Sequence, residues 1–199
     1  MASSYPALWT AASIGHAEEV RRLLEVGGSK IDSKVPHGET ALHAAVKGGH
    51  GAIMELLLAK GARVDVKTNH GSMDTALHFA VRGGHHAIVA RLLEKGAGVD
   101  VKNCSWDTAL HLAIRCKDLA IAILLLGNGA DMLAPNQRSQ TPQDLASEAT
   151  RPRRTSRLCL QGSQAPQDFV SVPLRLGFAE MLHEEATRRA AAQPGETHP

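Results

Sequence analysis

Aromatic residues are scarce in this sequence of 199 residues. Phe, Trp and Tyr make up only 3% of it, although 43% of the residues are hydrophobic. Any core must therefore be built mainly from Leu, Ile, Val and Ala, a composition that favours helices over strands. A chain of this length can bury roughly two thirds of its unfolded surface. We expect an all-α protein with a real hydrophobic core.

Cysteine is also rare and is not arranged in pairs. The three cysteines, Cys104, Cys116 and Cys159, have neither the short paired spacing of a zinc site nor the density of a disulfide scaffold. This pattern is typical of reduced thiols. It predicts a protein of the cytosol, the nucleus or both, with no structural metal.

Long apolar runs and an excess of one charge are missing as well. The longest apolar run, "LAIAILLL" at residues 119–126, has eight residues, far fewer than a membrane span needs. The first residues show no basic stretch followed by an apolar one, so we expect no secretory signal. The formal net charge is +2, without the concentrated basic field typical of nucleic-acid binding. Neither a membrane nor a nucleic acid is an expected partner.

What the sequence does contain is a repeat. "TALHAAVKGGH" from Thr40 returns as "TALHFAVRGGH" from Thr75 and as "TALHLAIRCKD" from Thr108, at steps of 35 and 33 residues. A further 33 residues lead to "TPQDLASE" at Thr141, and 34 residues before Thr40 lies Pro6 in "PALWTAASIGH". These markers predict five units in a domain over residues 5–163.

A second marker keeps the same phase. A glycine stands 21 residues after each of three threonines, at Gly61, Gly96 and Gly129, and closes a leucine-rich run. The apolar spacing predicts two antiparallel helices in each unit, the first short and rich in alanine. The glycine supplies the left-handed residue that ends the second helix.

On these residues the sequence resembles the ankyrin repeat family. The family pattern T-x-L-H-x-A, then G-H, a branched aliphatic, L-L and G-A, is met almost residue for residue in the units at Thr40 and Thr75. The unit at Thr108 matches more loosely, because Lys117 and Asp118 replace Gly-His. The resemblance implies an all-α ankyrin solenoid of four to five helix-turn-helix units with a short C-terminal tail.

The histidines are interpreted as structural. Each repeat threonine falls at a helix start, where its hydroxyl can accept a hydrogen bond from a free backbone N–H. The resemblance implies that His43, His78 and His111 bond around that turn and tie it to the preceding connection. Packed repeats stand about 10 Å apart, too far for equivalent imidazoles to share an ion. We expect no metal site.

No residues suggest catalysis or a bound cofactor. The cysteines and repeat histidines form no nucleophile–base signature, and Gly48-Gly49 and Gly83-Gly84 are predicted to end helices rather than to open a phosphate loop. We expect no catalytic residue, no cofactor and no enzymatic activity.

A candidate binding surface follows from one position of the repeat. The seventh residue after the repeat threonine reads Lys47, Arg82 and Arg115, flanked by Ser13 and Glu148 in the outer units. In one interpretation three stacked cations line a groove for an acidic peptide or protein surface. In the other, this is a solvated position that is basic three times.

The connections between repeats add further candidates. The connection "KTNHGSMDT" at residues 67–75 is two residues longer than the next one, and its tip carries His70 and Met73. Longer loops are tolerated and often serve recognition. In the next connection Trp106 stands where the family has a turn glycine. It is either an exposed interface anchor or packed over the neighbouring tip.

The last part of the chain leaves two alternatives open. Residues 151–162 either form a degenerate capping helix that completes the fifth unit or belong to a flexible basic tail. "RRTS" in this segment makes Ser156 a candidate phosphorylation site. Residues 164–199 read as a linker, a helix at about 176–192 and a disordered end.

These observations predict a monomeric, non-enzymatic protein-interaction module, such as an adaptor, a scaffold or an inhibitor. An alternative is a substrate receptor of a ubiquitin ligase. Some ankyrin proteins carry a C-terminal SOCS box, and "RLCLQ" followed by "VPLRL" resembles its order, although the cysteine spacing departs from it. Ankyrin-type kinase inhibitors have a similar number of repeats, but no residue singles them out.

Overall fold

The protein forms a stack of helix pairs, as the repeat predicts. The computed structural model describes residues 6–26, 30–69 and 71–150, and this part of the chain contains helices and no strand. The helices are α1 (Ala7–Ile14), α2 (Ala17–Glu25), α3 (Ala41–Lys47), α4 (Gly51–Ala59), α5 (Ala76–Arg82), α6 (His86–Glu94), α7 (Ala109–Cys116), α8 (Leu119–Gly127) and α9 (Pro142–Thr150). The predicted all-α ankyrin solenoid is confirmed.

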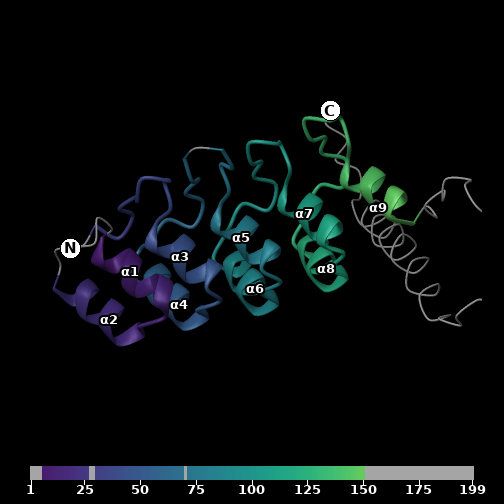
Figure 1. Ribbon diagram of the computed structural model, residues 1–199. Helices are drawn as coiled ribbons and strands as arrows, with labels where there is room; N and C mark the ends of the chain where they lie inside the picture. Colours follow the sequence, from purple (N-terminus) through teal and green to yellow (C-terminus); the bar gives the residue numbers. More distant parts are fainter. Residues whose placement is uncertain (1–5, 27–29, 70, 151–199) are drawn as a thin grey trace, which may run out of the picture.

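The helices form two rows (Figure 1). The first helices of the units pack in sequence, α1 on α3, α3 on α5, α5 on α7 and α7 on α9. The even-numbered helices form the second row, and the connections between units project away from it (Figure 1). We call these projections fingers; they comprise residues 31–39, 64–74, 99–107 and 132–140.

Reciprocal caps start the first helices. The hydroxyl of Thr40 accepts the backbone N–H of His43, while Nδ1 of His43 accepts the backbone N–H of Thr40 at 3.1 Å. Thr75 with His78 and Thr108 with His111 repeat this arrangement. It satisfies two N–H groups that a helix start otherwise leaves unpaired, which explains why short helices begin at these threonines.

The contact made by Nε2 of each repeat histidine differs from the one expected from the sequence. Nε2 of His43 lies 2.8 Å from the carbonyl oxygen of Val66, and Nε2 of His78 lies 3.2 Å from that of Asp107. His111 makes the same contact with Gln140 at 3.2 Å. The histidines therefore join each helix start to the following connection, not to the preceding one. Nδ1 is held at the histidine's own cap, so Nε2 reaches into the interface with the next unit.

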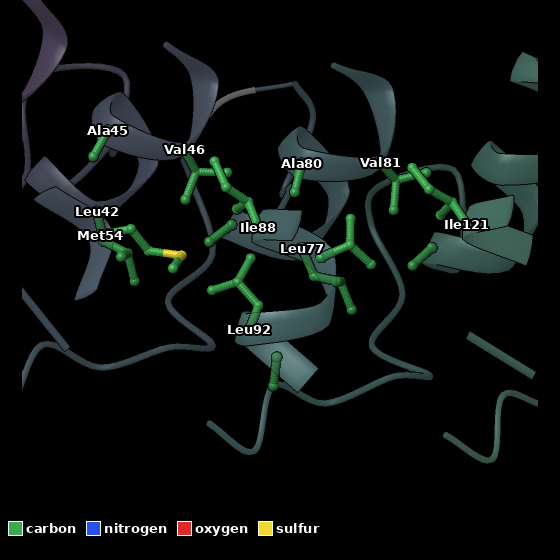
Figure 2. Packing of buried hydrophobic residues seen from close by; sticks show 14 of the residues in the cluster. Leu42, Ala45, Val46, Met54, Leu77, Ala80, Val81, Ile88, Leu92 and Ile121 are labelled. Atoms are coloured by element: carbon green, nitrogen blue, oxygen red, sulfur yellow. The ribbon is translucent and has the colours of Figure 1, made fainter. Parts of the chain in front are cut away.

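Buried aliphatic side chains fill the space between the rows and between the units. Figure 2 shows Val46 of α3 beside Ile88 of α6, and one unit further along Val81 of α5 beside Ile121 of α8. All four are at most 5% exposed. Burying such a side chain contributes roughly 1.5–3 kcal/mol. Each unit thus buries its apolar face against its neighbour.

The predicted helix ends are also present. Gly61, Gly96 and Gly129 follow the second helices with φ of 90°, 82° and 92°, the left-handed region that glycine adopts without strain. The description stops with α9. The possible capping helix at 151–162, the tail at 164–199 and its possible helix at 176–192 lie outside the described residues.

Candidate functional site

The three predicted cations form a row along the first helices. Lys47, Arg82 and Arg115 each stand in the last turn of α3, α5 and α7. We call them the groove row. Each lies against a carboxylate from its own unit: Lys47 Nζ is 3.2 Å from Glu39, Arg82 Nη1 is 2.9 Å from Asp74 and Arg115 Nη1 is 2.9 Å from Asp107. The row exists, but its charges are largely neutralised.

The aspartates of these pairs are buried and held by the next finger. Asp74 and Asp107 are 0% and 3% exposed. Asn103 donates from Nδ2 to the second oxygen of Asp74 at 3.1 Å, and Asn136 does the same to Asp107 at 2.9 Å. Each carboxylate therefore accepts an arginine on one oxygen and an asparagine on the other. A buried carboxylate satisfied in this way holds its arginine in one place.

The two arginines keep donors free for a ligand. Their side chains are 48% and 58% exposed for Arg82 and Arg115. Among the described residues, only Nη1 of each guanidinium donates to the protein. The remaining N–H groups form a rigid fork suited to carboxylate or phosphate oxygens. The groove row thus offers positioned donors rather than a broad positive field.

Apolar side chains line the groove beside these cations. Phe79 is half-buried, with Lys47 Nζ 5.7 Å and the Arg82 guanidinium carbon 6.0 Å from its ring centre. Leu112 and Leu145 stand at the same position in the next two units, where Leu112 is buried and Leu145 half-buried. One large apolar side chain of each unit therefore lies among these polar groups.

Two hollows adjoin along this groove. One, of about 370 Å³, is lined by residues that include Arg82, Arg115, Leu112, Cys104 and Cys116. The other, of about 340 Å³, is lined by residues that include Arg115, Arg138, Leu145 and Glu148. Both are lined by Arg115 and Asp107. A ligand that spanned the two would pass the Arg115 guanidinium.

The groove row ends at the last described unit. Glu148 stands in the cation position there, and Gln140 Nε2 donates to it at 3.5 Å. A contact between the same two positions is kept, but the cation is replaced by a carboxylate and the carboxylate by a neutral amide. Arg138 lines the same hollow as Glu148. The groove is therefore electrostatically different at its two ends.

The fingers carry a second row of cations with different partners. Lys34, Lys67 and Lys102 donate from Nζ to the main-chain carbonyls of Lys67, Lys102 and Pro135, at 3.0, 2.7 and 3.0 Å. We call these lysines the finger row. Lys34 is exposed and the other two are half-buried. Within the described part of the chain, none of them forms an ion pair with a carboxylate.

Three aspartates, one in each of the first three fingers, also connect neighbouring units. Asp32, Asp65 and Asp100 each accept a backbone N–H from the next unit, at Arg63, Gly98 and Asp131, over 2.9–3.1 Å. In the last finger, Leu133 and Pro135 stand where the others have the aspartate and the lysine. Leu133 is 66% exposed. Because neither Leu133 nor Pro135 carries a charged side chain, the row of aspartates and the finger row do not continue in the fourth finger.

The finger tips share an unusual backbone conformation. Gly38, Met73, Trp106 and Ser139 occupy one position of the turn, with φ of 79°, 50°, 60° and 55°. Glycine tolerates this left-handed region, whereas another residue is disfavoured there by about 1–2 kcal/mol. Met73 and Trp106 are 45% and 54% exposed. Three of the four tips therefore hold a strained residue.

The structure describes the surroundings of Trp106 in part. The residue is 54% exposed, and Lys102 of the same finger lies above the indole, with Nζ 5.5 Å from the ring centre. Its role as an interface anchor stays a prediction. Two other predicted residues, His70 and Ser156, lie outside the described residues, as do the "RLCLQ" and "VPLRL" segments.

The sequence reasoning missed the polar network behind the groove row. Asp74 and Asp107 each directly precede the repeat threonine, and Asn103 and Asn136 each stand five residues before it. This fixed phase was the available signal. It could have shown that each arginine has a carboxylate in its own unit.

The repeat histidines have the electrostatics of structural groups. Burial lowers the pKa of His43, His78 and His111 below the ordinary value, since the charged form would lose its hydration. Nε2 faces a carbonyl, which can only accept, so the neutral imidazole carries its proton on Nε2. In the described ranges, no three His, Cys, Asp or Glu side chains gather in a way that could hold a metal ion.

Comparison with family models identifies the repeat. A model described as ankyrin repeats (3 copies) matches residues 3–68 and 64–136, which together cover more than half of the chain. No curated protein matches this sequence. None of the helices over residues 6–150 has the length and apolar character needed to cross a membrane.

Proposed function

Because the chain belongs to the ankyrin repeat family, we propose that it is a non-enzymatic protein-binding module whose partner lies in the groove between the first helices and the fingers. Ankyrin repeats are generally protein–protein interaction modules. The groove of this chain has what such a contact needs, namely two adjoining hollows, a leucine in the lining of each and fixed polar groups.

One observation carries the proposal. Arg82 and Arg115 are anchored by buried aspartates and still present free N–H groups to the hollows. We infer a partner segment whose carboxylate side chains bind these guanidinium groups while an apolar side chain covers Phe79 or Leu112. Because each arginine is ion-paired, the attraction acts at contact distance, and long-range steering contributes little.

The broader role follows the same logic. A monomeric stack with one groove would act as an adaptor, a scaffold or an inhibitor in the cytosol or the nucleus. Its unpaired cysteines, Cys104 and Cys116, suit a reducing compartment.

Affinity capture with matched variants tests the groove. The bait is the parent chain or the double variant Arg82→Gln, Arg115→Gln, and the control is Lys60→Gln, Lys95→Gln at the ends of α4 and α6. We expect proteins that are captured by the parent and the control but lost with the groove variant, which melts below the parent but stays folded at the capture temperature, as circular dichroism would check. Identical captures with all three baits would contradict the groove. Elongin and cullin subunits among the captured proteins would instead indicate a ubiquitin-ligase receptor.

A further inference from the structure

We propose that Met73 and Trp106, at the tips of the second and third fingers, are binding anchors held in place at the expense of backbone strain. They would bind a partner segment that offers an aliphatic or aromatic side chain together with a carboxylate. The inference rests on the proposed protein-binding function, but it places a specificity contact outside the groove.

The four fingers differ in the residue that occupies the strained turn position. The same turn position holds Gly38 in the first finger and Met73, Trp106 and Ser139 in the others, all at positive φ. Glycine could adopt this conformation in every finger, so the backbone conformation does not require a large side chain. A strained residue persists where another property of the side chain is needed.

Met73 and Trp106 contribute nothing evident to the core. They are 45% and 54% exposed, among the few large apolar side chains exposed in the described part of the chain. Methionine adapts to irregular surfaces, and tryptophan is the residue most enriched at binding hot spots. Cys104 donates its N–H to the Ser72 carbonyl at 2.8 Å, which joins the two fingers close to their tips. The two anchors therefore stand on one connected support.

The charge beside Trp106 indicates the chemistry of the partner. Lys102 lies over the indole at 5.5 Å and forms no ion pair among the described residues. Its one bond to the Pro135 carbonyl leaves donors of the ammonium group available. A carboxylate next to an apolar side chain would meet both groups at once. An anionic membrane surface offers a similar charge, so the experiment separates the two.

Thermal unfolding tests the first half of the inference. Trp106→Gly and Met73→Gly remove the strain, and Ser139→Gly is the matched control at a polar tip. We expect all three variants to melt at the parent temperature or up to about 4 °C above it, because relief of strain exceeds the entropy that glycine adds to the unfolded chain. A fall of more than about 3 °C for the Trp106 or Met73 variant would show a structural role and overturn the inference.

Selection of peptides tests the second half. Random linear segments in a display library are selected on the parent chain, and the enriched clones are synthesised as the probes. We expect clones that combine an apolar residue with Asp or Glu. Their affinity should fall at least tenfold for Trp106→Gly with Met73→Gly, and should stay within twofold for Ser139→Gly. Clones that bind all variants equally would overturn the anchors.

The same clones separate this inference from the proposed groove. Binding lost only with Arg82→Gln, Arg115→Gln would support the groove and overturn the tips; binding lost only with the tip variants would do the reverse. A selection that enriches no binding clone would overturn both. Vesicles of phosphatidylcholine and phosphatidylserine serve as a second probe. Vesicle binding that depends on Trp106, without any peptide binding, would overturn a protein partner.

Discussion

The groove row and the finger row carry the same charge at the same interval, one cation in each of three successive units, but they meet different partners. Each cation of the groove row bonds a carboxylate eight residues earlier in its own unit. Each lysine of the finger row bonds a carbonyl in the next unit, 33 or 35 residues on. The first row organises a unit, and the second joins units together. Equal periodicity in a sequence therefore does not imply an equal role.

The largest effect on the free energy of unfolding is expected when Asp107, the buried carboxylate that binds Arg115, is replaced. Asp107→Ala removes the acceptor of both Arg115 and Asn136 and leaves Nδ2 of the buried Asn136 without its acceptor. We expect a loss of about 2–4 kcal/mol in the free energy of unfolding, measured by urea titration. Arg115→Gln, which leaves the Asn136 bond intact, should cost clearly less. Equal losses for the two variants would mean that the carboxylate is not the centre of the network.

Cations of both rows also affect the pKa of the repeat histidines. Lys67 and Arg82 disfavour the charged form of His78, and Lys102 with Arg115 do so for His111, in addition to the dominant effect of burial. The pKa of each buried histidine is lowered in the folded state, so below about 6.5 the unfolded chain binds more protons.

Stability from these histidines is therefore complete above pH 6.5 and is lost as the pH falls. We expect the free energy of unfolding to fall by up to about 1.4 kcal/mol per pH unit for each histidine that stays neutral in the folded state. Urea titrations at pH 7.5 and 5.5 measure the loss, and His111→Gln should reduce it. A free energy of unfolding that does not fall between these two pH values would refute the lowered pKa.

A smaller effect is expected from the finger row. Lys67→Met keeps most of the side chain's apolar stem and removes its 2.7 Å bond to the Lys102 carbonyl. The loss should be about 1 kcal/mol, the net value of one hydrogen bond, because the unfolded parent chain replaces this bond with bonds to water. Lys60→Met is the control, as that lysine ends α4 away from the fingers. If the two variants lose the same free energy in urea, the finger row does not join the units.

The smallest effect on the free energy of unfolding is expected for Lys47, the first cation of the groove row. Lys47 is 60% exposed and its distance to Glu39 is 3.2 Å, longer than the two arginine pairs. Lys47→Met should change the free energy of unfolding by less than about 0.5 kcal/mol, and added salt should remove the difference. A loss comparable to that of Arg115→Gln would show that the deeper burial of Asp107 than of Glu39 does not distinguish the members of the row.

Much of the fold could be predicted because it depends on residues in fixed phase. The threonines, histidines and closing glycines each make a local interaction whose geometry one short motif specifies, as at Thr40 and Gly61. The row Lys47, Arg82 and Arg115 was found for the same reason.

The environment of these side chains could not be predicted in the same way. The counter-charges Asp74 and Asp107 belong to a different position of the repeat, and only packing brings them to the arginines. The direction of the histidine contacts depends on which side of a unit the imidazole faces. Strain at Met73 and Trp106 requires knowledge of φ. Which carboxylates and apolar groups a partner brings is a property of the partner, so the binding residues remain a prediction.

The finger row has a consequence for how such a protein can change over generations. Each lysine contacts a main-chain carbonyl, a group that every residue type carries. The joint therefore does not read the sequence of the neighbouring unit. It also tolerates the second finger, which is two residues longer than the third, since Lys67 still reaches the Lys102 carbonyl. Duplication, deletion or exchange of a whole unit would preserve the joint, while the tips and the groove could diverge independently.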